Sequence, residues 1–255
     1  MSKRKKKQQI NLRVIIGASF STLVLTLTLL AFNWSNYTGL NHLENIEIKG
    51  AFIIPADEYR ESLSPVLGTT INDIKTRNMS LLLESHPFVH AARISKSFPN
   101  KIIVEIMERH PVALLNMDPL LYIDREGVVL PELGNVGEKI IPIMSGFNTA
   151  RELYPIGHQT VSQKVSESID LIDYIIEHFP GMYENLSEVT LNSNDEFVLI
   201  LANYPTKVIL GNDHMEEKIQ ILNSFEQSLP EDKGLYNFSS LDLRYNHQVI
   251  VKVRV

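Results

Sequence analysis

Apolar positions form three kinds of pattern along this chain, and each pattern predicts a different kind of element. Residues 14–32 form an unbroken apolar run that contains no charged residue. Further on, apolar residues recur at helical spacing over 162–179 and 215–229, and they alternate with polar residues in shorter segments. The pattern therefore predicts an α+β protein with one N-terminal membrane-spanning helix.

The apolar run has the length of a transmembrane helix. At about 1.5 Å per residue its 19 residues span roughly 28 Å, close to the thickness of a bilayer's hydrocarbon core. Residues 3–7 and Arg13 are basic, and no acidic residue precedes Glu44. Because clustered basic residues stay on the cytoplasmic side, we predict a cytoplasmic tail at 1–13 and a transmembrane helix at 14–34.

A cleaved signal peptide is the alternative interpretation of this run. Signal peptides have a shorter apolar region, followed by small residues at an A-x-A-like cleavage site. Here the run is longer and ends in Ala31-Phe32-Asn33-Trp34, which is a poor cleavage site. These features favour an uncleaved anchor.

The segment after the anchor predicts a small unit over residues 42–110. Gly50 and Pro87 interrupt its periodic segments, as expected of residues that end strands and helices. Its elements have the order β-α-α-β-β: strand 46–49, helices 56–63 and 76–85, and strands 89–96 and 101–109.

Residues 111–255 predict a larger mixed α/β domain built on a mainly antiparallel sheet. The course of 132–160 stays open. The two predicted helices are 162–179 and 215–229, and the strands are 112–115, 120–123, 128–130, 186–191, 196–201, 206–210, 241–245 and 248–255.

The last predicted strand alternates strictly. Valines at 249, 251, 253 and 255 share one face, and Ile250, Lys252 and Arg254 share the other, so one side can pack on a core while the other meets solvent. If this strand ends the sheet, its outer edge offers unpaired N–H and C=O groups to another strand. The alternative is a plain edge strand whose charges discourage aggregation, and the residues alone favour that alternative.

Charge and composition narrow the possible functions. The first 43 residues carry six basic residues and no acid, so the remainder carries 18 basic and 30 acidic residues. An acidic exported part argues against nucleic acid as a partner. The chain has no cysteine, which excludes disulfides, thiolate catalysis and cysteine-based metal sites.

Few residues suggest catalysis or metal binding. His86 and His90 have the spacing of metal ligands on a helix, but Pro87 lies between them and a strand begins beside them. We therefore expect no metal site there. The sequence contains neither a glycine-rich phosphate loop nor a Gly-x-Ser-x-Gly elbow, although separated catalytic carboxylates stay possible.

Four local patterns carry a family resemblance. In chain order they are His86-Pro87-Phe88-Val89 with Ala91-Ala92, then Phe98-Pro99-Asn100-Lys101-Ile102, Glu108-Arg109-His110-Pro111-Val112-Ala113 and Leu241-Asp242-Leu243-Arg244-Tyr245. In this order behind a single anchor, they resemble the FtsQ/DivIB family of bacterial cell-division proteins. The unit at 42–110 then resembles a POTRA domain, and 111–255 resembles the FtsQ-type β domain.

The resemblance implies a function and its binding residues. FtsQ-like proteins are non-enzymatic scaffolds that cross the inner membrane once and act at the division septum, with the C-terminal part in the periplasm. In this family FtsB, in complex with FtsL, adds a strand at the C-terminal edge. That role carries over to Arg244, Tyr245, Gln248, Val249, Ile250, Val251, Lys252 and Val253.

A second docking surface is implied on the POTRA-like unit. Its strand edge begins near Val89 and includes Ala91 and Arg93, and further partners would be division proteins of the FtsK, FtsW and FtsI types. The resemblance implies no cofactor. Two other functions compete with it: a membrane-tethered cell-wall enzyme with a site in 111–255, and a POTRA-bearing translocation component, which would normally continue into a membrane barrel.

Overall fold

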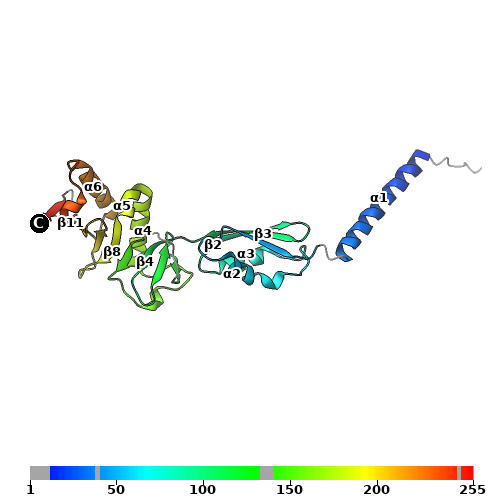
Figure 1. The fold of residues 1–255 in the computed structure, drawn as a ribbon, viewed down its shortest axis with the longest axis horizontal. Coiled ribbons are helices and arrows are strands. Elements are labelled where there is room, and N and C mark those ends of the chain that lie inside the picture. The colour runs from blue at the N-terminus through cyan, green and yellow to red at the C-terminus, as the bar shows by residue number, and fades with distance from the viewer. Residues whose placement is uncertain (1–11, 38–40, 133–140, 246–247, 255) are drawn as a thin grey trace, which may run out of the picture.

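The computed structural model describes residues 12–37, 41–132, 141–245 and 248–254. Along the chain it contains an N-terminal helix, a three-stranded sheet with two helices, and a larger sheet with three helices (Figure 1). The α+β fold class predicted from the sequence is confirmed.

Helix α1 (Leu12–Tyr37) contains the apolar run. Its segment Ile15–Trp34 has a mean hydropathy of 2.1, and none of that segment is buried against the rest of the protein. The Thr22 and Thr26 hydroxyls donate hydrogen bonds to backbone carbonyls one turn earlier, at 3.0 and 2.6 Å. Because these polar groups are bonded within the helix, α1 suits a hydrocarbon environment and is long enough to cross it.

The first sheet has the strand order β1-β3-β2. Strand β1 (Asn45–Lys49) is parallel to β3 (Lys101–Glu108), and β2 (Val89–Ser97) is antiparallel to β3. Helices α2 (Ala56–Ser62) and α3 (Thr76–Glu84) come between β1 and β2 in the chain. The observed order β-α-α-β-β is the predicted one.

One face of this sheet carries the first hydrophobic core. Inward positions of β3, such as Ile102 and Val104, are fully buried. They lie in one cluster with Tyr59 of α2 and with Met79 and Leu83 of α3. The two helices therefore cover the same face of the sheet.

A buried carboxylate holds the loop between β1 and α2. Glu108 continues the inward alternation of β3 and is only 4% exposed. Its oxygens accept hydrogen bonds from the N–H groups of Phe52 and Ile53, both at 2.7 Å, from that of Ile54 at 3.0 Å and from the Tyr59 hydroxyl at 2.8 Å. Burial, together with the hydrogen bond to Glu108, raises the pKa of Tyr59, which keeps this hydroxyl a donor.

Glycine is required where the chain enters this loop. Gly50 has φ of +83°, a conformation that residues with a Cβ rarely adopt. A Cβ at this position would also collide with the backbone carbonyl of Ile106. Both constraints explain why the strand ends at this glycine.

The second sheet has nine strands among the described residues, in the order β12-β11-β10-β9-β8-β7-β4-β5-β6. The pairs β10–β11, β7–β8 and β4–β7 are parallel and the others are antiparallel, so the predicted mainly antiparallel sheet is confirmed. Its strands are β4 (Pro111–Leu115), β5 (Leu121–Asp124), β6 (Val129–Leu130), β7 (Ile143–Ser145), β8 (Leu186–Leu191), β9 (Phe197–Leu201), β10 (Lys207–Gly211), β11 (Phe238–Asp242) and β12 (Ile250–Val253).

Within the described residues, three α-helices accompany this sheet: α4 (Gln163–His178), α5 (Pro180–Glu184) and α6 (Met215–Ser228). Ser162 caps the N-terminus of α4, because its hydroxyl accepts a hydrogen bond from a backbone N–H of the first turn. Buried residues of α4 and α6, Ile172 among them, belong to the second core with the inner face of the sheet. Helix α5 was not predicted, because Pro180 was expected to end the helical segment rather than to begin a new short helix.

The β5–β6 hairpin joins the two units. Leu130 of β6 is buried in the first core although β6 pairs within the second sheet. Val128, just before β6, is buried in the same core, and Tyr122 of β5 packs against it. Beside them, Arg109 Nη1 donates to carboxylate oxygens of Asp124 and Glu126, both at 2.7 Å. Apolar packing and a charged cluster thus connect the two sheets.

Replacing the buried Glu108 by glutamine tests whether its carboxylate holds the loop between β1 and α2. We expect Glu108→Gln to lower the free energy of unfolding by about 2–3 kcal/mol, since an amide turns donors toward N–H groups that need an acceptor. Urea denaturation of residues 41–255, followed by circular dichroism, measures the change. The matched control Glu105→Gln, on the exposed side of the same strand, should stay within about 0.5 kcal/mol. Equal losses in both variants would contradict this role.

The charged cluster predicts a weak acid sensitivity. The hydrogen bond from Arg109 is the main reason that the pKa of Glu126 lies below its usual value. A lowered folded-state pKa gives stabilisation that is complete above the unfolded value of about 4.3 and is lost as pH falls through the folded value. Glu126 is half exposed, so we expect only about 0.5 kcal/mol.

The measurement compares the unfolding free energies of the unmodified protein and Glu126→Gln at pH 7 and at pH 3. Their difference should shrink at the lower pH. The control Glu61→Gln, at an exposed position of α2, should show no such convergence. A difference that grows toward pH 3 would show that the carboxylate is not stabilised by Arg109.

Candidate functional site

Strand β12 is the outermost strand of the second sheet. It pairs with β11 in antiparallel register, with Val251 opposite Leu241 and Ile250 opposite Asp242. Among the described residues it has no second strand partner. Its outer side therefore carries backbone N–H and C=O groups that are not part of the ladder, which is the property predicted from the sequence.

The burial of the β12 side chains differs from the prediction. All four are exposed, including Val251 at 39% and Val253 at 61%, although alternation would let one face pack on a core. The cause is the extent of the helix layer: Phe225 of α6 packs against Phe238 of β11, with ring centroids 5.6 Å apart. Because β11 is the last strand that this core covers, β12 offers apolar side chains as well as backbone groups.

Of the remaining predicted edge residues, three lie just outside the strands and one lies within β12. Gln248 and Val249 precede β12, and Val249 packs partly against the second core. Lys252 lies within β12 and is exposed. Tyr245 is 53% exposed. The predicted turn at 246–247 lies outside the described residues.

Arg244 is held by two carboxylates of its own chain. Its Nε and Nη2 donate to Asp242 at 3.0 and 2.7 Å, and its Nη1 donates to Glu196 at 3.2 Å. These partners raise the pKa of Arg244, and Arg244 in turn lowers the pKa of Asp242. The guanidinium therefore stabilises the chain segment that follows β11. A carboxylate of a partner would have to share the Arg244 guanidinium with Asp242 and Glu196.

Arg254 is a residue whose role the sequence did not reveal. The sequence placed it only on the polar face of the last strand. In the structure its backbone N–H donates a hydrogen bond to the backbone carbonyl of Asn237 at 2.9 Å. Its guanidinium donates hydrogen bonds to the backbone carbonyls of Tyr236 and Phe238 at 3.2 and 3.1 Å. It also lies 5.7 Å from the centroid of the Tyr204 ring. Arg254 thereby fastens the end of β12 to the sheet.

The second predicted docking surface lies on β2, an edge strand of the first sheet. Ala91 and Arg93 are exposed there, and Arg93 Nε lies 3.9 Å from Glu105 Oε2. Val89 is only 2% exposed and packs in the first core. Only its backbone is therefore available on this edge.

The two histidines that raised the question of a metal lie beside different acids. His86 Nε2 is 3.5 Å from Glu58, and His90 Nδ1 is 3.5 Å from Glu126. Within the described part of the chain, no three His, Asp or Glu side chains gather closely enough to hold a metal ion. The candidate site is therefore the sheet edge.

The fold and this edge define a class of protein: an N-terminal apolar helix followed by two sheet-bearing units, the last of which ends in an open strand. Comparison with known families gives the same picture. Residues 41–109 match the family described as POTRA domain, FtsQ-type, and residues 110–252 match the one described as FtsQ/DivIB, C-terminal related. The chain belongs to the FtsQ/DivIB family, and the resemblance found in the sequence is confirmed.

Curated relatives agree with this assignment. The cell division protein FtsQ of Syntrophotalea carbinolica is 22% identical over 248 residues, which cover 94% of this chain and 86% of that protein. The FtsQ proteins of Geobacter sp. strain M21 and Rhodothermus marinus are 25% and 26% identical, covering 87% and 82% of this chain and 79% and 77% of their own lengths. The chain thus has a role in bacterial cell division, in which it works with other division proteins.

Proposed function

We propose that this chain is a non-enzymatic scaffold of the division machinery that captures the FtsB/FtsL complex by strand addition at β12. It would cross the inner membrane once, with its basic N-terminus in the cytoplasm and both sheets in the periplasm at the septum. By holding its partners together it would link early and late division proteins for septal peptidoglycan synthesis. The family assignment and the open edge together support this proposal.

The observation that carries the proposal is the position of β12 at the end of the sheet. A visiting strand would gain main-chain hydrogen bonds along the outer side of β12, and these bonds do not depend on sequence. The exposed side chains of Ile250, Val251 and Val253 supply apolar contact on both faces. Backbone pairing would then give affinity, and these side chains would give selectivity.

The residues around the edge suit capture by a short strand. Arg254 and the register with β11 keep β12 extended, so little ordering entropy remains to be lost on binding. Lys252 contributes one exposed cation on an otherwise acidic exported part. Tyr245 adds an exposed aromatic ring just after the end of β11. An acidic or neutral partner strand with apolar side chains fits this surface best.

For the first sheet we propose that the outer edge of β2 is a second docking surface. Ala91 and Arg93 are exposed, and the outer side of β2 lacks a strand neighbour among the described residues. Division proteins of the FtsK, FtsW or FtsI types would dock there. This second surface lies nearer in sequence to α1, which suits partners that are themselves membrane proteins.

Placing a charge on the edge tests the proposal. We expect Val251→Glu to raise the Kd for a purified FtsB/FtsL complex at least tenfold, because the carboxylate would be desolvated beneath the added strand. Binding of the full-length variant in nanodiscs, measured by biolayer interferometry, gives the result. The matched control Val161→Glu, at a valine that is 66% exposed elsewhere, should bind as the unmodified chain does. Unchanged affinity in Val251→Glu would refute strand addition at β12.

The proposed orientation has its own test, which the absence of cysteine makes simple. Single cysteines are introduced as Ser2→Cys in the basic tail and Ser224→Cys at an exposed position of α6. In cells with a permeabilised outer layer, a membrane-impermeant maleimide should label only Ser224→Cys, because the basic residues keep the tail inside. Labelling of Ser2→Cys before lysis would reverse the proposed topology.

A further inference from the structure

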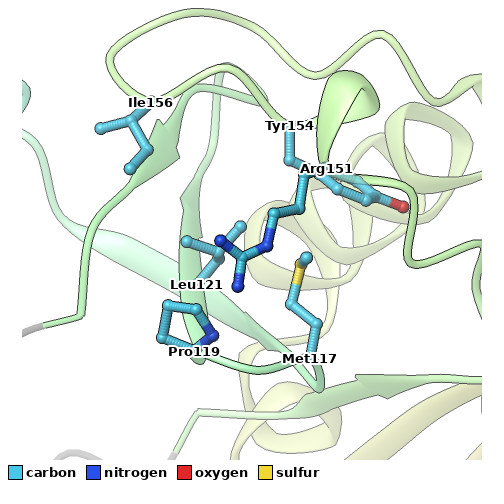
Figure 2. Close-up of a pocket in the computed structure, with 6 residues that line it drawn as sticks. All are labelled: Met117, Pro119, Leu121, Arg151, Tyr154 and Ile156. Carbon is cyan, nitrogen blue, oxygen red and sulfur yellow. The ribbon is translucent and has the colours of Figure 1, made fainter.

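A small apolar cavity lies near the end of the second sheet opposite to β12. It has a volume of about 210 Å³ and forms where the β4–β5 turn meets the segment around residues 151–156. Figure 2 shows its six lining residues, which are Met117, Pro119, Leu121, Arg151, Tyr154 and Ile156. Cavities that hold drug-sized ligands measure roughly 300–1,000 Å³, so this one suits a single large side chain.

The lining combines a fixed floor with an exposed rim. Leu121 and Tyr154 are 6% and 3% exposed and belong to the second core, and the Tyr154 hydroxyl donates to the carbonyl of Asn148. Ile156, on the rim, is 51% exposed. An apolar group entering here would cover apolar surface that is now in water, while the floor would not need to move.

One guanidinium projects into this apolar space. In Figure 2 the side chain of Arg151 points between Leu121, Pro119 and Met117. Its Nη2 donates to the carbonyl of Asp118 at 2.8 Å, and within the described ranges it forms no ion pair with a carboxylate. Five other arginines of the two units form such pairs, whereas among the described residues Arg77 and Arg254 do not. The five are Arg60, Arg93, Arg109, Arg125 and Arg244.

From position 44 onward the chain has 30 acidic and 18 basic residues, so carboxylates are abundant. None of the carboxylates that the structure describes is placed on Arg151. Arg151 is an exposed residue beside the apolar lining. A guanidinium fork binds a carboxylate through two parallel hydrogen bonds, which are stronger than hydrogen bonds between neutral groups. The cavity therefore complements a group that is apolar and carries a carboxylate close by.

We propose that this cavity binds the C-terminal residue of a partner polypeptide, with the apolar side chain on the floor and the terminal carboxylate on Arg151. The two groups must lie within a few ångströms of each other, and a C-terminal residue carries both on one Cα. Consecutive residues within an extended strand place their side chains on opposite faces, so they fit this geometry less well. The site is separate from β12 and goes beyond the proposed capture of FtsB/FtsL.

A set of short peptides tests the proposal on the full chain in nanodiscs with ¹³C-labelled methionine and isoleucine methyl groups. Acetyl-Gly-Gly-Gly-Leu with a free carboxylate should shift the methyl signals of Met117 and Ile156 and saturate in the millimolar range. The same peptide with a C-terminal amide should bind at least about fivefold more weakly, because a charge-assisted hydrogen bond is lost. A peptide that ends in glycine should also bind more weakly, because the floor stays uncovered.

Protein variants identify the residue that recognises the carboxylate. Arg151→Glu should abolish the preference for the free acid, whereas Arg77→Glu makes the same charge change at an exposed arginine of α3 and should leave it intact. Ile156→Ser should weaken the acid and the amide by the same factor. Val251→Glu should bind the peptide normally, so failure of this site and failure of the β12 site are distinguishable.

Three results would overturn the proposal. They are equal affinity for the acid and the amide, an acid preference that persists in Arg151→Glu, and methyl signals of Met117 and Ile156 that do not move with the free acid. A fourth result would also overturn it: equally tight binding of an amidated peptide with an internal Leu-Asp pair would show that the cavity accepts internal acidic segments rather than chain ends.

Discussion

An open strand edge must be kept in place by the one strand beside it, and this constraint shapes the C-terminal half of the protein. Strand β12 has no core beneath it, since all four of its side chains are exposed. Its neighbour β11 supplies the missing support through the buried side chains of Phe238 and Leu241, and Arg254 ties the end of β12 to the same strand. The edge can thus stay extended and available while the core ends one strand earlier.

The junction between the two sheets depends on two consecutive residues that point in different directions. Glu108 turns into the first core and gathers the backbone of the β1–α2 loop, whereas Arg109 reaches the carboxylates of Asp124 and Glu126 beside the second sheet. Leu130, from the second sheet, completes the first core. Because each unit contributes to the packing of the other, displacement of one sheet would disturb charged and apolar contacts together.

Periodic segments could be predicted from the sequence, and features set by distant partners could not. The anchor, the β-α-α-β-β order and the helix α4 follow from runs long enough to show a period. Strand β7 has only Ile143–Ser145, and its neighbours β4 and β8 are far away in the chain, so no local pattern could reveal it. The domain boundary between 110 and 111 stays a prediction.

The candidate site likewise contains features that the sequence predicted and features that depend on distant parts of the chain. Alternation identified the strand β12, but alternation cannot indicate where a helix layer stops, so it did not show that both faces of β12 are exposed. It also gave no sign that Arg244 is occupied by Asp242 and Glu196. If β12 captures a strand as proposed, that guanidinium is already paired, so discrimination would fall to the exposed side chains of β12 and to Tyr245. Because the backbone of an edge can pair with any strand, these few side chains would then have to exclude the wrong partners.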